Sequence, residues 1–180
     1  MKTIIGIDPG AGGGLAFNFD GEVTAHNMPD TLADIRDLLE NIEPRDSVIY
    51  CERVGTYMPG NSGPSAAKFS EHVGALKGIV CALRIPVHFP TPAQWMHAFI
   101  GKPTYPPLPK LPPLTKPKTA EYKEIEKKRK TISAHRKQER KNKIKAKAQQ
   151  LYPHLKVTLA ISDALGILWY AEQQERGMLI

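Results

Sequence analysis

The sequence of 180 residues predicts one α/β domain, a mixed β-sheet with helices on both faces. Three observations lead to this prediction. Short apolar runs alternate with stretches whose apolar residues recur every three or four positions, in the order β-β-β-α-β-α-β-α. A chain of this length suits a single domain with a sizeable core, which we place over residues 1–180. A Pro-rich and basic insertion, residues 102–138, interrupts the pattern before a last apolar helix.

The N-terminal part predicts three antiparallel strands, a helix and a further strand. Asp20-Gly21 lies between two apolar runs and is a hairpin signal. Asp30 or Thr31 can cap the helix, which extends to about Ile42 with apolar residues on one face. The strands are expected at Thr3–Asp8, Leu15–Phe19, Val23–Met28 and Ser47–Cys51.

The C-terminal part adds a fifth strand and three helices outside the insertion. Pro92 favours a helix start, because proline is preferred at the first helical position. Trp95 and Phe99 fall on the apolar face of that helix and are assigned to the core. The expected elements are a long helix from the Gly- and Pro-rich loop at 55–64 to about Leu83, a strand at Val87–Phe89, a helix from Thr91, and a helix over about Thr158–Glu175.

The insertion dominates the charge of the protein. Residues 102–147 hold 16 of the 25 Lys and Arg but only 4 of the 18 Asp and Glu, a net charge of +12. Pro103–Pro117 contains seven of the 16 prolines and predicts an extended linker. The basic stretch Thr119–Lys147 has acids near its start and lysines later, as suits a helix dipole. Such a block is typical of a nucleic-acid-binding surface, and a solvated arm is the alternative.

Several classes of protein are excluded by what the chain does not contain. No apolar run approaches the ~20 residues of a membrane span, and the N-terminus does not resemble a secretory signal. Cys51 and Cys81 lie in apolar stretches without metal-ligand spacing, which predicts reduced core thiols. We therefore expect an intracellular, cytoplasmic protein with no membrane partner.

Three carboxylates are placed where chemistry is plausible. Asp8 ends the first strand and Glu52 ends the strand after the first helix, and these strands are plausible neighbours in the sheet. Asp163 lies in the apolar last helix and shares a face with Gly166 and Ile167, so it should point toward the sheet. A buried acid costs free energy unless it is paired or binds a metal. Turn chemistry at Asp8, a basic partner for Glu52 and a helix dipole at Asp163 are the structural alternatives.

Carboxylates grouped in this way suit hard divalent cations. Oxygen ligands are those that Mg²⁺ or Mn²⁺ prefers, and two such ions about 3.5–4 Å apart are a common device for phosphodiester hydrolysis. The glycines after Asp8 would let a phosphate backbone approach. Together with the basic block, the three acids point to metal-dependent chemistry on nucleic acid.

Three short motifs contain these acids: Ile5-Gly6-Ile7-Asp8-Pro9-Gly10, Ile49-Tyr50-Cys51-Glu52 and Ser162-Asp163-Ala164-Leu165-Gly166-Ile167. In this order they resemble the RuvC-type Holliday junction resolvases. The resemblance covers about residues 1–101 and 140–175, and the long basic insertion suits a phage or viral member. It implies a ribonuclease H-like (RNase H-like) fold with a five-stranded mixed sheet, and a homodimer that resolves four-way DNA junctions.

The resemblance also implies roles for individual residues. Asp8, Glu52 and Asp163 would be catalytic metal ligands for two ions, Mg²⁺ or Mn²⁺. The family usually carries a fourth acid one helical turn before the last, where this chain has Ala160. A basic catalytic residue is expected before the final motif, with two candidates, Lys141 and Lys143, and an aromatic wedge after Glu52, with the candidates Tyr57 and Met58. Further DNA contacts are expected at Lys127, Lys128, Arg129, Lys130, Arg136, Lys137, Arg140 and Lys145.

The resulting hypothesis is a metal-dependent, structure-selective endonuclease that makes paired symmetric nicks in branched DNA, leaving 5′-phosphate and 3′-OH ends. Two alternatives stay open. One is a nuclease of the same fold that acts on other branched DNA or on RNA–DNA hybrids. The other is a catalytically silent junction-binding protein, which Ala160 favours.

Overall fold

The computed structural model describes residues 2–55 and 63–179. In this part of the chain, five strands form one mixed sheet in the order β3-β2-β1-β4-β5. β1 pairs antiparallel with β2 and parallel with β4, and the β2–β3 hairpin turns at Asp20-Gly21, where both residues have positive φ. The strands are β1 (Thr3–Asp8), β2 (Gly14–Phe19), β3 (Glu22–Asn27), β4 (Ser47–Cys51) and β5 (Val87–His88).

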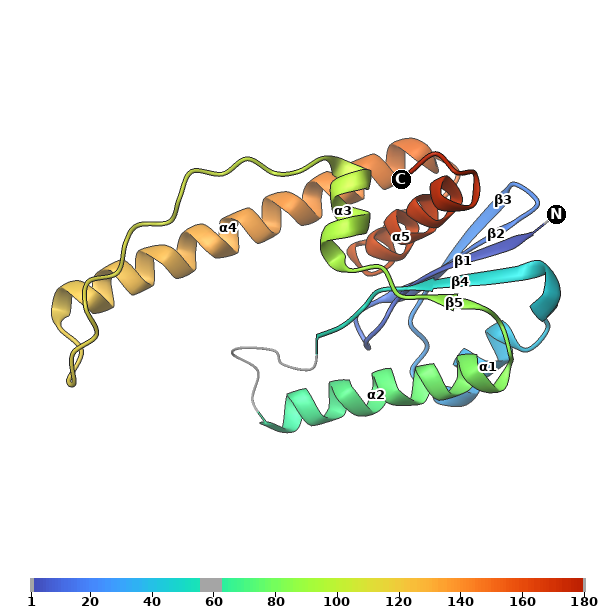
Figure 1. The fold of residues 1–180 in the computed structure, drawn as a ribbon, viewed down its shortest axis with the longest axis horizontal. Coiled ribbons are helices and arrows are strands. Elements are labelled where there is room, and N and C mark those ends of the chain that lie inside the picture. The colour runs from blue at the N-terminus through green and yellow to red at the C-terminus, as the bar shows by residue number, and fades with distance from the viewer. Residues whose placement is uncertain (1, 56–62, 180) are drawn as a thin grey trace.

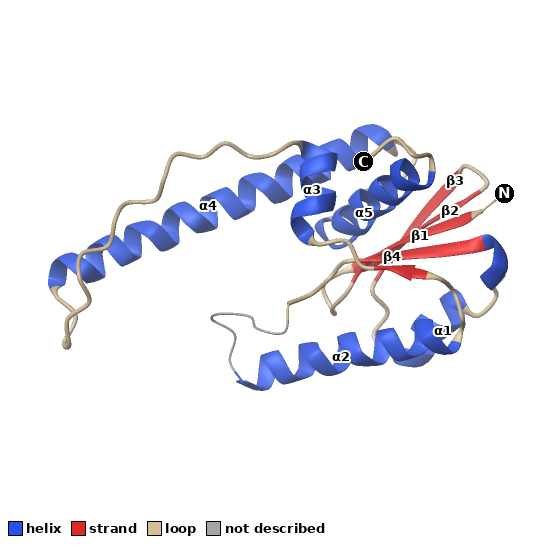
Figure 2. Cartoon of the chain, in the orientation of Figure 1, coloured by secondary structure: helices blue, strands red, loops and turns tan. Residues whose placement is uncertain are grey.

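Helices cover both faces of the sheet, as Figures 1 and 2 show. α1 (Leu32–Leu39) and α2 (Gly63–Ala82) lie on one face, and α3 (Pro92–Ile100), α4 (Ala120–Leu151) and α5 (Leu159–Glu175) lie on the other. The α/β class with a five-stranded mixed sheet, predicted from the alternation of apolar runs, is therefore confirmed.

The buried side chains of the described residues form one cluster on each face of the sheet. Because successive strand residues point to opposite faces, Ile5, Ile7 and Ile49 pack against α1 and α2, while Val48 and Tyr50 pack toward α3 and α5. This alternation fixes which way each strand-end residue faces. It therefore determines where the acids that follow β1 and β4 emerge.

The helix α5 lies unusually close to β1. A Cβ at Gly6 would come within 2.5 Å of the Ala164 carbonyl oxygen and of the Leu168 nitrogen. Only glycine permits this approach, so the motif containing Asp8 and the helix containing Asp163 are pressed together.

Two element boundaries and the burial of one cysteine differ from the sequence prediction. α1 ends at Leu39 rather than Ile42, because Pro44 starts a short 3₁₀ helix (Pro44–Asp46) and Ile42 reaches the core from the connecting turn. β5 ends at His88 rather than at Phe89, which is 40% exposed. Cys81 is exposed and only Cys51 is a core thiol, because the buried stripe of α2 consists of Val73, Leu76 and Val80.

The insertion forms an arm that projects from the body (Figure 1). α4 is one continuous helix of 32 residues, and its C-terminal end is fixed to the body by buried Ile144 and Ala148. Lys147 adds to this anchor: its ammonium group donates to the Phe99 carbonyl oxygen and lies 5.0 Å from the centres of the Phe99 and Trp169 rings. We call residues 102–118 the strap and residues 102–138 the arm.

The strap is extended, as its prolines predict, and it runs along α4 (Figure 1). Arg129 and Arg136 of α4 donate to the carbonyl oxygens of Pro109 and Pro106, each at 2.5 Å. The Arg136 guanidinium also lies 4.8 Å from the centre of the Tyr105 ring. These contacts hold the two sides of the arm together.

In the described residues no helix combines the length and the apolar character that a bilayer crossing requires.

Candidate active site

Asp8 and Glu52 stand side by side at one edge of the sheet. β1 and β4 are parallel neighbours with Ile7 opposite Cys51, so the next residue of each strand emerges at the same edge. The Glu52 backbone N–H donates to the Ile7 carbonyl oxygen at 2.9 Å, which continues the ladder beyond the strand. The juxtaposition predicted for these two acids is present.

Asp163 reaches the same edge from the second turn of α5. Thr158 caps this helix by accepting a hydrogen bond from the Ile161 N–H, and the close packing of α5 on Gly6 directs the helix start toward the end of β1. Asp163 is half-buried, and the Ser162 hydroxyl donates to its carboxylate at 3.4 Å. All three predicted acids therefore lie at the same edge of the sheet, contributed by three elements.

The electrostatics of the three acids show that they share one environment. Burial, together with the charges of Asp163 and Glu52, raises the pKa of Asp8 from 3.8 to about 8. Burial is also the main cause that raises the pKa values of Glu52 and Asp163. Three half-buried carboxylates that oppose one another's ionisation make a site in which a cation would be strongly favoured.

Trp95 is a part of this site that the sequence did not reveal. Its indole N–H donates to the Glu52 carboxylate, with 2.7 Å between Nε1 and Oε2, and this bond lowers the pKa of Glu52 against the effect of burial. Trp95 is 1% exposed and fits only because residue 166 is glycine, where a Cβ would lie 2.8 Å from the indole ring. The sequence placed Trp95 correctly in the core. The polar use of its N–H depends on a tertiary contact between α3 and β4, so no local pattern could indicate it.

Two cations of α4 lie near the acids. The charge of Lys141 lowers the pKa values of Asp8 and Asp163, and that of Arg140 lowers those of Glu52 and Asp163. Of the two lysines predicted as basic catalytic candidates, Lys141 is the one whose charge acts on these carboxylates. Lys143 instead forms an ion pair with Glu139 at 2.8 Å on the surface of the helix.

The donor set suits a hard divalent cation, since it consists of carboxylate oxygens with one tryptophan N–H in support. Within residues 2–55 and 63–179, however, no three His, Cys, Asp or Glu side chains are close enough together to hold one ion. The acids thus form an open arrangement whose side chains would have to converge on a metal.

The remaining predicted site residues fall into three groups. Tyr57 and Met58 lie outside the described residues. Ala160 lies in the first turn of α5, three residues before Asp163, at the position where the resemblance implies a fourth acid. The predicted DNA contacts are all on α4, but not on one face: Arg129 and Arg136 bind the strap and Lys128 pairs with Glu124 at 2.7 Å, whereas Lys127, Lys137 and Lys145 make no ion pair with a described residue.

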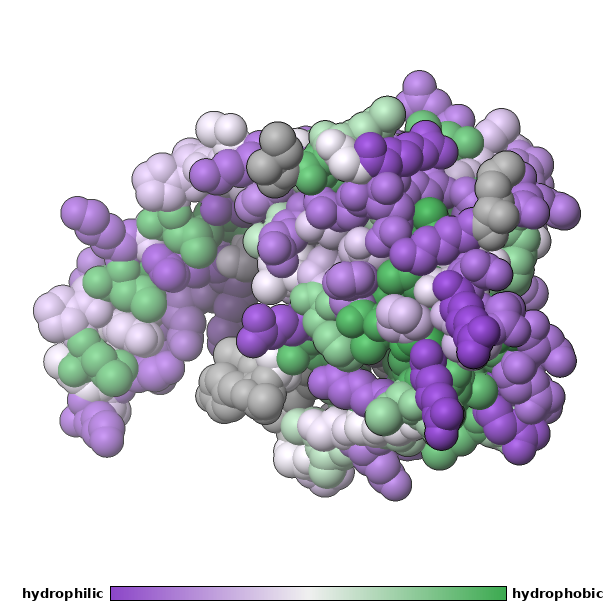
Figure 3. Space-filling model, turned by 45° about the vertical axis from the view of Figure 1, so that its right-hand side comes forward, coloured by the Kyte–Doolittle hydropathy of each residue, from purple (hydrophilic) through white to green (hydrophobic). Residues whose placement is uncertain are grey.

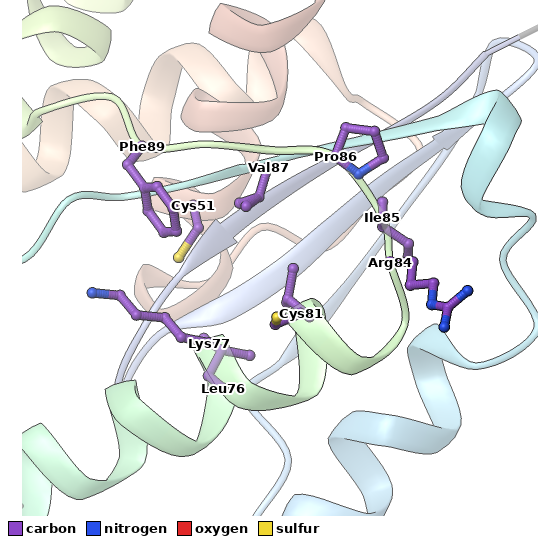
Figure 4. A pocket seen from close by; sticks show the side chains of 10 residues that line it. Cys51, Leu76, Lys77, Cys81, Arg84, Ile85, Pro86, Val87 and Phe89 are labelled. Atoms are coloured by element: carbon purple, nitrogen blue, oxygen red, sulfur yellow. The ribbon is translucent and has the colours of Figure 1, made fainter.

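A cavity of about 430 Å³ lies elsewhere, between α2 and the strands β4 and β5 (Figure 4). Its walls are mainly apolar, and the Lys77 ammonium lies 5.4 Å from the Phe89 ring centre at its rim. None of the three carboxylates lines it. It is therefore separate from the candidate active site.

Comparison with known proteins supports the fold. No protein family model and no curated protein sequence matches the chain. Two solved structures are similar over nearly the whole length of both chains. The RuvC structure from Thermus thermophilus is 16% identical, with a TM-score of 0.53 and 98% of each chain covered. T. thermophilus RuvC in complex with Holliday junction substrate is also 16% identical, with a TM-score of 0.54 and coverage of 99% of this chain and 98% of that one. The chain therefore has a RuvC-like, RNase H-like α/β fold.

Proposed function

We propose that this protein is a metal-dependent endonuclease that resolves four-way DNA junctions by paired, symmetric nicks. The observation that carries the proposal is the meeting of Asp8, Glu52 and Asp163 at one edge of the sheet, with burial raising the pKa of each. The basic α4 beside them and the similarity in fold to a RuvC that was solved with a Holliday junction substrate support branched DNA as the substrate.

In this proposal the three carboxylates hold two divalent ions, Mg²⁺ or Mn²⁺. Such ions, when bound, activate the attacking water and stabilise the leaving 3′-oxygen, which yields 5′-phosphate and 3′-OH ends. Trp95 holds one oxygen of Glu52 and leaves the other free to bind, so it fixes the orientation of that carboxylate. Lys141, within electrostatic reach of Asp8 and Asp163, positions the scissile phosphate next to them.

The proposal includes a homodimer, because a junction with two-fold symmetry is cut twice by a protein with the same symmetry. α2 is a suitable surface for the contact: only Val73, Leu76 and Val80 of its 20 residues are buried in the single chain. Sedimentation equilibrium of the chain alone and with junction DNA tests this part. A monomer in both conditions would contradict it.

The substrate is tested by cleavage with Mg²⁺ of four DNAs of equal length: a four-way junction, a replication fork, an RNA–DNA hybrid and a linear duplex. We expect paired nicks in the junction at rates at least about 100-fold above those of the duplex. Preferred cleavage of the fork or the hybrid would identify a nuclease of the same fold with another target.

The second candidate function is a junction-binding protein without catalysis, and the specific observation in its favour is Ala160 in place of a fourth acid. Tight binding of the junction without nicking in either Mg²⁺ or Mn²⁺ would establish this alternative. Nicking by the natural chain would show that three carboxylates are enough.

A further inference from the structure

The two sides of the arm differ in what they can bind. On one side, α4 presents half-buried residues to the strap at a helical spacing, namely Tyr122, Ile125, Arg129, Ile132 and Arg136. The strap covers these residues and exposes leucines on its own surface, with Leu111 37% and Leu114 61% exposed. Figure 3 shows the arm as a lobe separate from the body, with apolar patches between hydrophilic side chains. The strap side is therefore occupied.

The opposite side of α4 carries a row of six lysines with a gap at Ala134. Its members follow one another at intervals of three or four residues, so they lie on one face of the helix. The row consists of Lys123, Lys127, Lys130, Ala134, Lys137, Lys141 and Lys145. We call this set the lysine row.

Apart from Lys141, which acts on the acids of the candidate site, and a long contact of Lys130, the lysine row faces no opposing charge among the described residues. The four acids of α4 lie off it and pair elsewhere or face another side: Glu124 with Lys128, Glu139 with Lys143, and Glu126 with Lys118 of the strap. Within the described part of the chain, the only ion pair of a row member is a long one of 3.9 Å from Lys130 to Glu126. An uncompensated line of ammonium groups is what a nucleic-acid backbone neutralises.

One end of the lysine row is at the candidate active site. Ile144 and Ala148, three and seven residues after Lys141, are buried against the body, so this end of the row lies on the side of α4 that meets the body. The charge of Lys141 accordingly lowers the pKa values of Asp8 and Asp163. From Lys141 to Lys123 the row extends 18 residues along the helix, roughly 27 Å at 1.5 Å per residue. That is about the length of eight base pairs of B-form DNA.

We propose that the lysine row is a binding surface for one duplex arm of the DNA, along which the duplex lies from the carboxylates out to the tip of the arm. The inference rests on the proposed function for its substrate class and adds which surface holds the substrate and over what length. A duplex is favoured over a single strand because the row is straight, has the length of most of a helical turn and contains no aromatic residue on which bases could stack. Arg129 and Arg136, which hold the strap, are structural in this account.

The test compares two triple variants with the same change of charge. Lys123→Gln, Lys127→Gln and Lys137→Gln remove three row members without an ion pair to a described residue, and Lys102→Gln, Lys110→Gln and Lys116→Gln remove three exposed strap lysines as the matched control. Binding is measured in EDTA at several salt concentrations, on a junction with arms of about 20 base pairs and on one with arms of about 5 base pairs closed by hairpin loops. Circular dichroism verifies that both variants fold.

We expect the row variant to lose at least about 30-fold in affinity for the long-armed junction at 0.1 M salt, and its slope of log K against log salt to fall by about three. The control variant should stay within about threefold of the natural chain. On the short-armed junction the affinities of the natural chain and of the row variant should differ much less, because the duplex no longer reaches the outer lysines.

Ala134 provides a complementary variant, because it is the exposed gap in the lysine row. Ala134→Lys should tighten binding to the long-armed junction several-fold and steepen the salt slope by about one. Ser133→Lys, at an exposed position on the neighbouring side of the helix, is the control and should have a smaller effect.

Two outcomes would overturn the inference. A row variant that binds the long-armed junction as the natural chain does would show that the row is not the surface. Equal losses on a single-stranded oligonucleotide and on both junctions would exclude a duplex as its occupant. Nicking separates this result from the proposed function: a chain that binds duplex through the row but never nicks DNA in Mg²⁺ refutes only the nuclease, and normal nicking with an inert row refutes only the row.

Discussion

Asp8 is the residue whose environment has the largest measurable consequence. In the unfolded chain it releases its proton near pH 4, whereas in the folded protein, mainly through burial, its pKa is about 8. Between these values the folded state binds more protons than the unfolded state, so the free energy of unfolding falls as the pH rises. Above the folded pKa, the stability that protonated Asp8 contributes is lost completely.

Asp8→Asn should therefore stabilise the metal-free protein at high pH, because an amide avoids the buried charge. We expect the variant to exceed the natural chain by about 2 kcal/mol at pH 9 in EDTA, and the difference to shrink toward pH 5. Urea unfolding followed by circular dichroism measures it. Glu22→Gln, at an exposed carboxylate on β3, is the control, and a difference for Asp8→Asn that does not change with pH would refute this account.

Trp95→Phe separates the hydrogen bond to Glu52 from the packing of the ring. The phenyl ring still fills most of the space beside Gly166, but Glu52 loses the donor that orients it. We expect Mn²⁺ to bind about tenfold more weakly, as measured by calorimetry, with the fold intact. Trp169→Phe is the matched control, since Trp169 packs on Phe99 with 5.4 Å between ring centres. Equal effects of the two substitutions would mean that Trp95 acts only through packing.

Ala160→Asp tests the position where the resemblance implies a fourth acid. An acid in the first turn of α5 is also favoured by the helix dipole, so the substitution should fold well. We expect the Mg²⁺ concentration for half-maximal nicking to fall about tenfold. Leu159→Asp, at the neighbouring exposed position, should leave it unchanged. If Ala160→Asp has no effect, the site does not extend to this turn.

At the scale of elements, the arm depends on contacts between side chains of α4 and carbonyl oxygens of the strap. Arg129 and Arg136 make these contacts, each of which replaces a hydrogen bond to water. The strap thus stiffens the part of α4 that stands away from the body, where an isolated helix would be only marginally stable.

Replacing both arginines should release the strap. Arg129→Ala with Arg136→Ala is expected to speed tryptic cleavage after Lys110 about tenfold, because the backbone of the strap is no longer held on the helix. Lys128→Ala with Lys143→Ala removes two basic residues whose ion pairs are both within α4, and it should leave the cleavage rate unchanged. Mass spectrometry of the fragments gives the rates. Equal rates in both variants would contradict a structural role for the arginines.

The elements also show what local sequence can and cannot predict. The hairpin at Asp20-Gly21 and the start of α3 at Pro92 follow from turn and capping preferences that act within a few residues, and both are confirmed. The meeting of Asp8 and Glu52 follows from strand adjacency. By contrast, the division of the basic residues between strap contacts and the lysine row depends on where the strap lies, and the bond from Trp95 to Glu52 depends on how α3 packs. Neither can be predicted without the tertiary structure.

Across the whole molecule, a basic surface on α4 lies beside an acidic site at the edge of the sheet. The body, apart from residues 102–147, is mildly acidic, while the arm is strongly basic. A polyanion would therefore be drawn to α4 first and guided along it toward the carboxylates, which the body alone would repel. The proposed function therefore predicts that DNA affinity depends on the arm and cleavage on the carboxylates at the sheet edge.

The most direct test of the central claim is the mapping of nicks in a four-way junction labelled in turn on each strand, with Mg²⁺, for the natural chain and for Asp8→Asn. We predict nicks at symmetric positions in two opposite strands, with ends that DNA ligase reseals. We further predict that Asp8→Asn makes none while still binding the junction in EDTA. Nicks that persist in Asp8→Asn, or a natural chain that binds the junction tightly and leaves it whole, would contradict the assignment of these carboxylates to a nuclease site.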